Sequence, residues 1–385
     1  MAHSSPSSDL PDTMKVWRFH SVAGGAEKNM RLETMEIPDP KPTKSTLVKM
    51  VAASLNPIDI KASEIPVLGS CIHRLPAIPG CDGIGRVIET YEPSLSKGMM
   101  VQFRKNEMQP DGVFAEYVLL PPGQCAVIPD GVSTTQAVTV GTCGVTGYQA
   151  LAPYMLDKDG QPKKHGHTPR VFINGGSGGT GVFQIQLAKI FGWHVVTTCS
   201  ASNVELCKSL GADEVIDYRK EPAEEVLKRM VLEDSSKAFD LVVDNNSNPW
   251  PLFKAADVYL RSEGTYVQIG ADFAVDSARH FFNINLRPRF LGGARSKWTF
   301  MGMKTSREDS ERILEWMAGG KIHIPIDSEF AFEKVPEAYS KLKSGAKGGR
   351  LLSTFQNSHP YREMLGLDDD MEAAVATFSP SCRWS

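Results

Sequence analysis

The sequence lacks an excess of charge of either sign. Its 42 Lys and Arg residues stand against 45 Asp and Glu residues, which gives a formal net charge of -3. Proteins that hold nucleic acid or an anionic membrane surface concentrate basic charge, and this chain has no such surplus. We therefore expect a small-molecule partner and neither a nucleic-acid nor a membrane partner.

The sequence also lacks a long apolar run and a targeting signal. No uninterrupted apolar stretch reaches the roughly 18 to 20 residues that a membrane-spanning helix needs. The N-terminal stretch MAHSSPSSDLPDT is rich in Ser and Pro, carries Asp9 and Asp12, and has neither an apolar h-region nor the arginines of a mitochondrial presequence. This composition predicts a disordered leader over residues 1–14 and a cytoplasmic location.

Paired cysteines are missing as well. The seven cysteines are scattered along the chain, and no two of them are spaced as CxxC. This pattern argues against a disulfide framework and against a cysteine-rich zinc knuckle.

What the sequence does have is the length and apolar content for two folded domains. The chain has 385 residues, of which 41% are hydrophobic. Short β-rich runs cut by Gly and Pro extend from Lys15 to about Val132, whereas strand-like and helix-like segments alternate from Arg170 onward. We predict a β-rich unit over residues 15–150 and 300–355, a nucleotide-binding unit over 151–299, and a C-terminal tail over 356–385.

The second unit contains six strand candidates, which suits an α/β fold with a doubly wound parallel sheet of the Rossmann type. They are Arg170–Asn174, His194–Cys199, Glu214–Asp217, Asp240–Asp244, Thr265–Ile269 and Arg289–Leu291. The helix after the first strand is apolar over a wide face, so it should be buried. The next helix is predicted to begin with a capping box of Ser202 and Glu205 and to end at Gly211.

A polar, turn-rich stretch, DKDGQPKKHGH, lies between Pro153 and Pro169. We interpret it as a surface loop that leads into the first strand of the parallel sheet. Exposed loops also carry binding functions, so a partner-docking loop remains the alternative.

The central motif is the glycine pattern in INGGSGGTG. Gly176, Gly178 and Gly181 match GxGxxG, a pattern that is weak alone and stronger here because it follows an apolar strand and opens the buried helix. Glycines at these positions allow a tight turn and bring amide groups against a pyrophosphate at the helix N-terminus. The alternative is a plain glycine-rich turn. The residues predicted to bind cofactor here are Gly176, Ser177, Gly178, Gly179, Thr180 and Gly181.

The end of the second strand bears on which nicotinamide cofactor is bound. An Asp or Glu about 20 residues past the first glycine would hold the ribose 2'-hydroxyl of NAD. The sequence there is TTCSASN, and no carboxylate appears before Glu205. Ser200, Ser202, Lys208 and Tyr218 can offer donors or charge to a 2'-phosphate, which favours NADPH. Lys208 could instead be a solvated helix lysine, and Tyr218 a packed aromatic.

With these motifs the chain resembles the medium-chain dehydrogenase/reductase superfamily, in its zinc-free branch of quinone oxidoreductases and enoyl reductases. The resemblance covers roughly residues 15–355 and implies a GroES-like β-rich catalytic domain beside the Rossmann domain. Its landmarks are SLNPIDIK with Asn56 and Asp59, PGCDGIG with Gly80 and Asp82, GVFAEYV, TCGVTGYQAL, FINGGSGGTGVFQIQLAK, LGADEVIDY, FDLVVD and the closing GKI, PEAY and GGRLL segments.

The departures from the superfamily pattern concern the metal. The zinc-dependent branch has a cysteine ligand near the position of Asn56 and a GHE motif where this chain has Gly80, Cys81 and Asp82. It also has a four-cysteine lobe, which is missing between Phe103 and Gly112. The resemblance therefore implies no metal site, and Cys81 is expected to be a small buried thiol.

The resemblance implies hydride transfer from NADPH to an activated C=C bond of an enone, an enoyl thioester or a quinone. Asn56 and Lys61 are the candidate catalytic residues, because this segment approaches the nicotinamide in zinc-free relatives. Fungal trans-acting enoyl reductases that serve polyketide synthases have a lysine at the position of Lys61. The alternatives are a surface role for Lys61 and a structural role for Asp59. The tyrosine proton donor of many relatives is missing here, so water is the alternative proton donor.

By resemblance alone, Ile269 and Gly270 should flank the nicotinamide, and Gly349 should lie in a turn that closes over it. The resemblance also implies a possible homodimer and a possible polyketide synthase partner, with a free or carrier-bound substrate. Two other functions stay open: reduction of a carbonyl group as a tailoring step, and an NADPH-binding partner subunit with little turnover.

Overall fold

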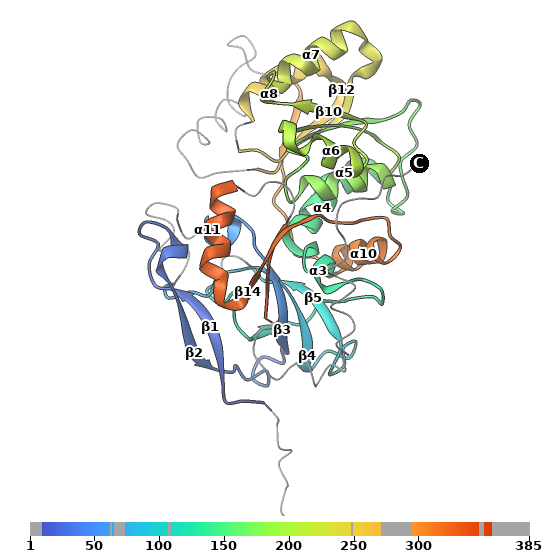
Figure 1. The fold of residues 1–385 in the computed structure, drawn as a ribbon. Coiled ribbons are helices and arrows are strands. Elements are labelled where there is room, and N and C mark those ends of the chain that lie inside the picture. The colour runs from blue at the N-terminus through green and yellow to red at the C-terminus, as the bar shows by residue number, and fades with distance from the viewer. Residues whose placement is uncertain are drawn as a thin grey trace, which may run out of the picture.

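The computed structural model describes residues 10–61, 64, 74–106, 109–247, 249–270, 295–345 and 350–355. Figure 1 shows two large sheets in separate lobes, one built mainly from the blue and cyan half of the chain and one from the green and yellow part. Of the predicted leader, residues 10–14 are described, and the first strand already begins at Thr13. The predicted tail, residues 356–385, lies outside the described residues.

The first lobe is antiparallel for the most part. Its seven-stranded sheet has the order β14-β15-β3-β4-β5-β7, with β6 paired to β3, and a separate hairpin joins β1 to β2. The strands β14 and β15, from the end of the described chain, therefore complete a sheet that begins near the N-terminus (Figure 1). The bounds are β1 Thr13–Phe19, β2 Met30–Glu36, β3 Thr46–Ser54, β4 Asp82–Glu89, β5 Met100–Arg104, β6 Tyr117–Leu120, β7 Cys125–Val127, β14 Ile326–Ala331 and β15 Arg350–Thr354.

The second lobe is built on a six-stranded parallel sheet of order β10-β9-β8-β11-β12-β13, the order of a Rossmann fold. The strands are β8 Arg170–Asn174, β9 His194–Cys199, β10 Glu214–Asp217, β11 Phe239–Asp244, β12 Leu260–Gln268 and β13 Lys297–Phe300. Five coincide with predicted strands. The sixth predicted strand, Arg289–Leu291, lies outside the described residues, and the sixth strand of the described sheet is Lys297–Phe300.

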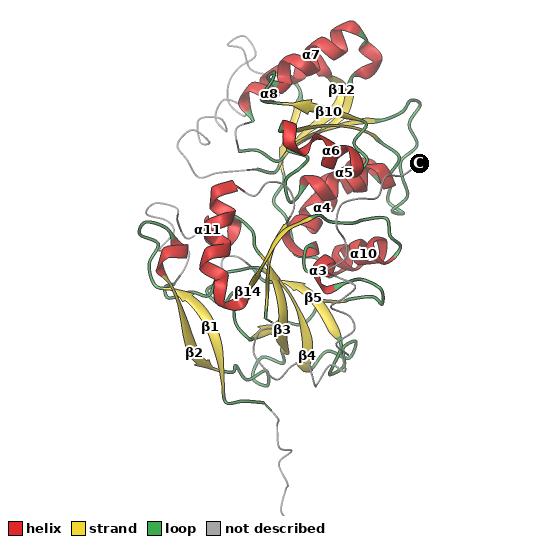
Figure 2. Cartoon of the chain, viewed as in Figure 1, coloured by secondary structure: helices red, strands yellow, loops and turns green. Residues whose placement is uncertain are grey.

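Helices cover both faces of the parallel sheet (Figure 2). Side chains of a strand point alternately to its two faces: Val171 and Ile173 pack with α4 and α5 on one side, whereas Phe172 packs with α7 and α8 on the other. The helix α5 is buried along most of its length, as its apolar sequence predicts. The helices are α1 Ile58–Lys61, α3 Thr134–Ala137, α4 Val145–Met155, α5 Gly181–Ile190, α6 Val204–Ser209, α7 Ala223–Glu233, α8 Trp250–Tyr259, α10 Arg307–Ala318 and α11 Val335–Gly345.

The start of α6 corrects the predicted capping box. A 3-10 turn at Ala201–Asn203 precedes the helix, and no side chain caps it. The hydroxyl of Ser202 bonds to that of Ser200 at 3.0 Å, and the carboxylate of Glu205 lies 3.2 Å from Lys208 Nζ. The backbone enters α6 from a helical turn, so the extended N-cap geometry that a capping box requires is not formed.

The sequence predicts no membrane-spanning helix. No helix among the described residues is both long enough and apolar enough to span a bilayer.

The buried carboxylate of Asp59 joins α1 to α11. The side chain of Asp59 accepts hydrogen bonds from the Asn56 amide at 2.8 Å and from the Tyr339 hydroxyl at 2.9 Å. Asp59 is 3% exposed, and its Oδ1 has no hydrogen-bond partner among the described residues. Burial raises the pKa of Asp59 to about 7, because the charged form loses its water. The interpretation of Asp59 as structural agrees with this geometry.

This raised pKa predicts a specific pH dependence of stability. Below the unfolded-state pKa of about 4, Asp59 is protonated in both states, and the stability tied to its protonated form is fully present. That stability falls as the pH rises through the folded-state pKa of about 7. Asp59→Asn cannot ionise, so its free energy of unfolding should fall less than that of the wild type between about pH 5 and pH 8, by about 3 kcal/mol.

Urea unfolding at several pH values measures the difference between the two proteins. Tyr339→Phe is the second variant: it removes one donor to the Asp59 carboxylate, so the pH-dependent fall should move to higher pH. Parallel curves for wild type and Asp59→Asn would contradict the assignment.

Candidate active site

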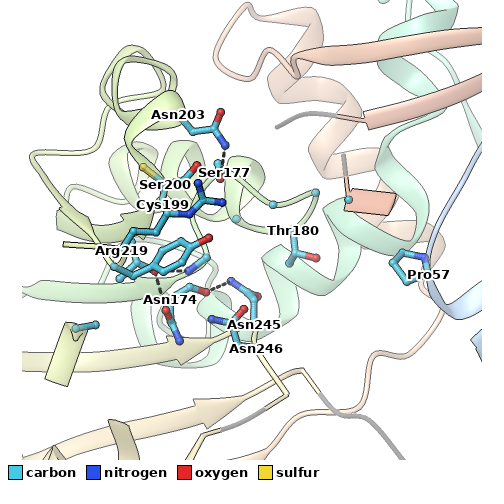
Figure 3. A pocket seen from close by; sticks show the side chains of 18 of the residues that line it. Pro57, Asn174, Ser177, Thr180, Cys199, Ser200, Asn203, Arg219, Asn245 and Asn246 are labelled. Carbon is cyan, nitrogen blue, oxygen red and sulfur yellow. Dashed lines mark hydrogen bonds between the residues drawn. The ribbon is translucent and has the colours of Figure 1, made fainter. Parts of the chain in front are cut away.

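A cavity of about 1280 Å³ lies at the carboxyl ends of the strands β8, β9 and β11. Open α/β sheets bind ligands at this edge. Arg219 and Pro57 lie on opposite sides of it (Figure 3), and Leu55 and Arg350 bring the first lobe into its wall. The cavity therefore joins the parallel sheet to the junction between the lobes.

The predicted glycine loop forms one side of this cavity. Gly175 has a φ of +88° and accepts a hydrogen bond from the amide of Gly178 at 3.2 Å, which closes the turn. The helix α5 begins directly after it, so its amide groups and positive dipole end face the turn. Five of the six predicted loop residues line the cavity: Ser177, Gly178, Gly179, Thr180 and Gly181.

Close packing explains why glycine occupies two of these positions. A Cβ at Gly176 would overlap the side chain of Thr197, and a Cβ at Gly181 would overlap the carbonyl of Gly175. Gly176 does not line the cavity but lies behind it, against β9. The three motif glycines thus shape the turn, and their neighbours supply the surface that a pyrophosphate would meet.

A buried arginine faces the loop, and the sequence analysis missed it. Arg350, the first residue of β15, is 4% exposed and lines the cavity. Its Nη1 lies 2.7 Å from Cys143 Sγ, and its Nη2 lies 2.8 Å from Asn56 Oδ1 and also bonds the Ser54 hydroxyl. A Cβ at Gly179 would approach its Nη1 to 2.9 Å, which shows how close the guanidinium lies to the loop.

The Nε of Arg350 has no hydrogen-bond partner among the described residues, although it is buried. An unsatisfied N–H of a guanidinium costs free energy unless a ligand accepts from it. Guanidinium groups suit phosphate oxygens in geometry and charge. The signal that could have identified Arg350 is its place directly after the predicted turn residue Gly349.

Asn56, a predicted catalytic residue, does not line the cavity. It is 1% exposed, and its amide is fully used: Nδ2 donates to Asp82 at 2.8 Å, and Oδ1 accepts from Arg350. Asp82 in turn accepts from the amide and hydroxyl of Thr142. The structure therefore makes Asn56 a support for Arg350 rather than a group that faces the cavity.

Lys61, the other predicted catalytic residue, ends the short helix α1 and is exposed. It is not among the residues that line the cavity, and its side chain has no hydrogen bond or ion pair with any described residue. Residues 62–63 and 65–73, which follow it, lie outside the described part of the chain. The catalytic role of Lys61 stays a prediction.

The far end of the cavity contains three of the four side chains predicted to select the cofactor. Ser200, Ser202 and Tyr218 line it, but Lys208 does not. Lys208 is exposed on α6 and forms an ion pair with Glu205, one helical turn before it. The pairing of these two side chains along the helix surface directs the ammonium group away from the role predicted for it.

Three further polar side chains occupy that end. Arg219 follows Tyr218 directly and lines the cavity, and its side chain forms no ion pair with a described residue. Asn203 donates to the Ser177 hydroxyl at 3.1 Å and so links the start of α6 to the glycine loop (Figure 3). Glu224, in the first turn of α7, is the one carboxylate among the described residues that line the cavity. The sequence signal that could have identified Arg219 is its basic side chain directly after Tyr218, a predicted cofactor-binding residue.

A row of asparagines forms the floor between the two ends. Asn174 ends the buried strand β8, and Asn245 and Asn246 follow the buried strand β11 (Figure 3). The Asp244 carboxylate accepts from Asn174 Nδ2 at 2.8 Å, from the backbone amide of Asn246 at 3.0 Å and from the Tyr266 hydroxyl, whereas Asn245 Nδ2 donates to the Asn174 carbonyl at 3.0 Å. Burial raises the pKa of Asp244. Polar residues directly after buried strands were the sequence signal for this row.

The residues carried over as nicotinamide neighbours lie beside this row. Ile269 donates its amide to the Asp244 carbonyl at 2.9 Å, and a Cβ at Gly270 would overlap the carbonyl of Asn245. Neither residue lines the cavity. Gly349 lies outside the described residues.

The described residues contain no group of three or more His, Cys, Asp or Glu side chains placed to hold a metal ion. Cys81 is 1% exposed, as expected for a small buried thiol, and burial raises its pKa well above the usual range. Asp82, at the acidic position of the motif, is engaged by Asn56 and Thr142 and lies 3.7 Å from Arg350.

Two family models match the chain. The alcohol dehydrogenase GroES-like domain matches residues 42–130, and the family described as zinc-binding dehydrogenase matches residues 210–352. The first falls in the lobe with the seven-stranded sheet. The second covers most of the parallel sheet and the strands β14 and β15.

Relatives and solved structures match over most of the chain. The trans-enoyl reductase pgmF of Aspergillus terreus is 37% identical, covering 90% of this chain and 97% of its own length. The chloroplastic quinone-oxidoreductase QR1 of Triphysaria versicolor is 30% identical over 88% of this chain and 98% of its own. The quinone oxidoreductase structure from Coxiella burnetii has a TM-score of 0.72 at 24% identity, covering 89% and 100% of the two chains.

The solved structure shows the same fold, so the predicted Rossmann sheet with a GroES-like domain is confirmed. The two relatives show the family and the enzyme class. The chain therefore belongs to the medium-chain dehydrogenase/reductase superfamily and is an oxidoreductase enzyme that uses a nicotinamide cofactor.

Proposed function

We propose that the protein is an NADPH-dependent, zinc-independent reductase of an activated C=C bond, in an enoyl thioester, an enone or a quinone. The observation that carries the proposal is the single cavity that runs from Arg219, past the glycine loop, to the junction between the lobes. The names of the relatives divide between enoyl reduction and quinone reduction, and both use a conjugated acceptor of hydride.

The residues present fit a dinucleotide. The turn shaped by Gly176 and Gly181 leaves space against the amides of residues 177–180 for a pyrophosphate, and the Arg350 guanidinium, whose Nε has no partner among the described residues, lies beside the same loop. Tyr218, Arg219 and the serines at the end of β9 would hold the adenosine ribose. When bound, the nicotinamide supplies the hydride.

The choice of NADPH over NADH rests on charge at the ribose end. The strand β9 ends in Cys199, and Ser200 follows where an NAD-binding sheet places an acid. Arg219 offers a guanidinium that no described carboxylate neutralises, and such a group suits a 2'-phosphate. The negative charge of Glu224 would repel a 2'-phosphate, but this residue belongs to α7 rather than to the end of β9, where an NAD-binding acid lies.

The junction end suits an apolar acceptor. Leu55 and Pro57 from the first lobe and Leu342 from α11 line the cavity there. These side chains exclude water from the reacting carbon and so strengthen the electrostatic interactions made with it. We propose that Lys61 donates the proton or orients the substrate carbonyl, with water as the alternative donor, and that Asn56 acts as a positioning residue through Arg350.

Two partners follow from the same proposal. A polyketide synthase would present the substrate on its carrier, as the relative's name, trans-enoyl reductase, suggests for pgmF. A homodimer would form through β13, which lies at one end of the parallel sheet and pairs with β12.

The direct test is turnover. Oxidation of NADPH by the full-length enzyme should be followed with a panel of quinones, enones and enoyl thioesters, with NADH beside it and zinc chelated. Turnover that prefers NADPH supports the proposal, and the best substrate separates enoyl from quinone chemistry. Activity that needs added zinc, or a preference for NADH, would contradict it.

Arg219→Gln should weaken NADPH binding and leave NADH binding unchanged. Loss of one charged hydrogen bond to the 2'-phosphate costs roughly 1.5 to 3 kcal/mol, so the Kd for NADPH should rise about tenfold or more. Lys208→Gln is the matched control, because that lysine pairs with Glu205 on the helix surface and should change neither Kd. An equal loss for both cofactors in Arg219→Gln would contradict the 2'-phosphate role.

Lys61→Ala should lower kcat by about a hundredfold if the lysine is the proton donor, since general acids contribute on this scale. NADPH affinity should stay unchanged, and Lys61→Arg should restore part of the rate if orientation by charge is the role. The exposed Lys97 of the first lobe, changed to Ala, controls for surface charge. Undiminished kcat in Lys61→Ala would remove this residue from the mechanism.

A further inference from the structure

A second cavity, of about 700 Å³, lies at the other edge of the parallel sheet. Its residues come from the amino ends of β11 and β12, from the start of β9 and from the loop before β8, and it shares no lining residue with the cofactor cavity. A volume of this size is in the range that holds a small organic molecule.

One wall is the loop interpreted from the sequence as a surface loop or a docking loop. Its backbone is fixed locally: the Asp157 carboxylate accepts from the amides of Asp159 and Gln161, each at 2.9 Å, and Lys163 donates its amide to the Met155 carbonyl at 2.9 Å. These hydrogen bonds give the wall a defined shape.

The opposite wall is an irregularity in β12. Its pairing with β11 passes from Phe239 opposite Leu260 to Leu241 opposite Thr265, so residues 261–264 leave the regular ladder. Bulges of this kind redirect side chains and are common beside binding sites. Here the bulge turns Arg261 toward the cavity.

Two buried nitrogens in these walls have no hydrogen-bond partner among the described residues. They are His165 Nε2 and Arg261 Nε. The His165 ring is held edge-on against Trp193, with ring centres 5.3 Å apart and planes at 83°, so the orientation of its nitrogen is fixed by packing. Buried polar atoms without partners cost free energy, and a ligand that accepts or donates here would satisfy them.

Two cations and two carboxylates line the cavity: Lys163 and Arg261, and Asp240 and Glu263. Asp240 is engaged by His167 Nε2 at 2.8 Å and by the Arg170 amide at 2.9 Å, and its oxygen lies 3.4 Å from Arg261 Nε. Glu263 pairs with Lys297 outside the cavity. Lys163 Nζ bonds the Pro153 carbonyl at 2.8 Å and forms no ion pair with a described carboxylate.

We propose that this cavity binds a small planar organic anion, an aromatic carboxylate. Its ring would lie against Tyr154 and His165, and its carboxylate would accept from Lys163 and Arg261. The aromatic walls favour a flat apolar body. Lys163, which forms no ion pair with a described carboxylate, favours one negative charge, and the unpartnered Nε2 of His165 favours a hydrogen-bonding oxygen.

The probe is 2-naphthoate, titrated calorimetrically into the full-length protein with and without saturating NADPH. We expect one site of submillimolar affinity that NADPH does not block, and weaker binding of the neutral analogue 2-naphthylmethanol. Lys163→Gln should raise the Kd roughly fivefold or more, as loss of a charged contact does. Lys164→Gln, the neighbouring exposed lysine that does not line the cavity, should leave the Kd unchanged.

Two more variants complete the test. His165→Phe keeps a ring against Trp193 and removes the unpartnered nitrogen, so it should weaken binding. Ser262→Glu places a negative charge at an exposed position of the cavity wall, where folding is not at risk, and should weaken binding even if His165→Phe fails to fold. Three results would overturn the proposal. They are no binding at millimolar 2-naphthoate, displacement of 2-naphthoate by NADPH, and wild-type affinity in both Lys163→Gln and Ser262→Glu.

Discussion

The arrangement of the candidate site depends on one buried guanidinium. Arg350 begins the last described strand, yet it contacts Ser54 and Asn56 from the first part of the chain and Cys143 from the segment before α4. A buried cation is tolerated only when it is compensated, and Asp82, 3.7 Å away and held by Thr142, supplies the opposite charge. The polar network thereby holds the Arg350 guanidinium beside Gly179 of the glycine loop.

The rest of the cavity divides into regions of different chemistry. The glycine loop and Arg350 offer N–H groups for a doubly charged linker, and Arg219 adds a cation at the far end. Between them, Asp244 holds the Asn174 side chain and the Asn246 backbone, and Asn174 and Gln184 accept from the Asn245 side chain. Leu55, Pro57 and Leu342 line the junction end, and Pro222 and Ala223 lie beside Glu224 at the far end. The cavity thus offers both charged and apolar surface along its length.

Local signals predicted much of this fold and site. Periodicity located five of the six parallel strands, and the glycine motif located the loop, since both depend on residues close in sequence. The contacts that the sequence did not predict depend on competing partners or on distance. Lys208 pairs with Glu205 along α6, and the side-chain amide of Asn56 bonds Asp82 and Arg350. The contacts of Arg350 span almost three hundred positions, and no spacing rule reaches that far.

The most direct measurement is the affinity of Arg350→Gln for NADPH and for NADH, by titration calorimetry, with circular dichroism to verify the fold and Arg229→Gln as a surface control. The account predicts a Kd raised about tenfold or more for both cofactors, because the pyrophosphate is common to them, with partial recovery in Arg350→Lys. Unchanged affinity in a folded Arg350→Gln would show that the guanidinium does not face the cofactor, and would contradict the assignment of the cavity.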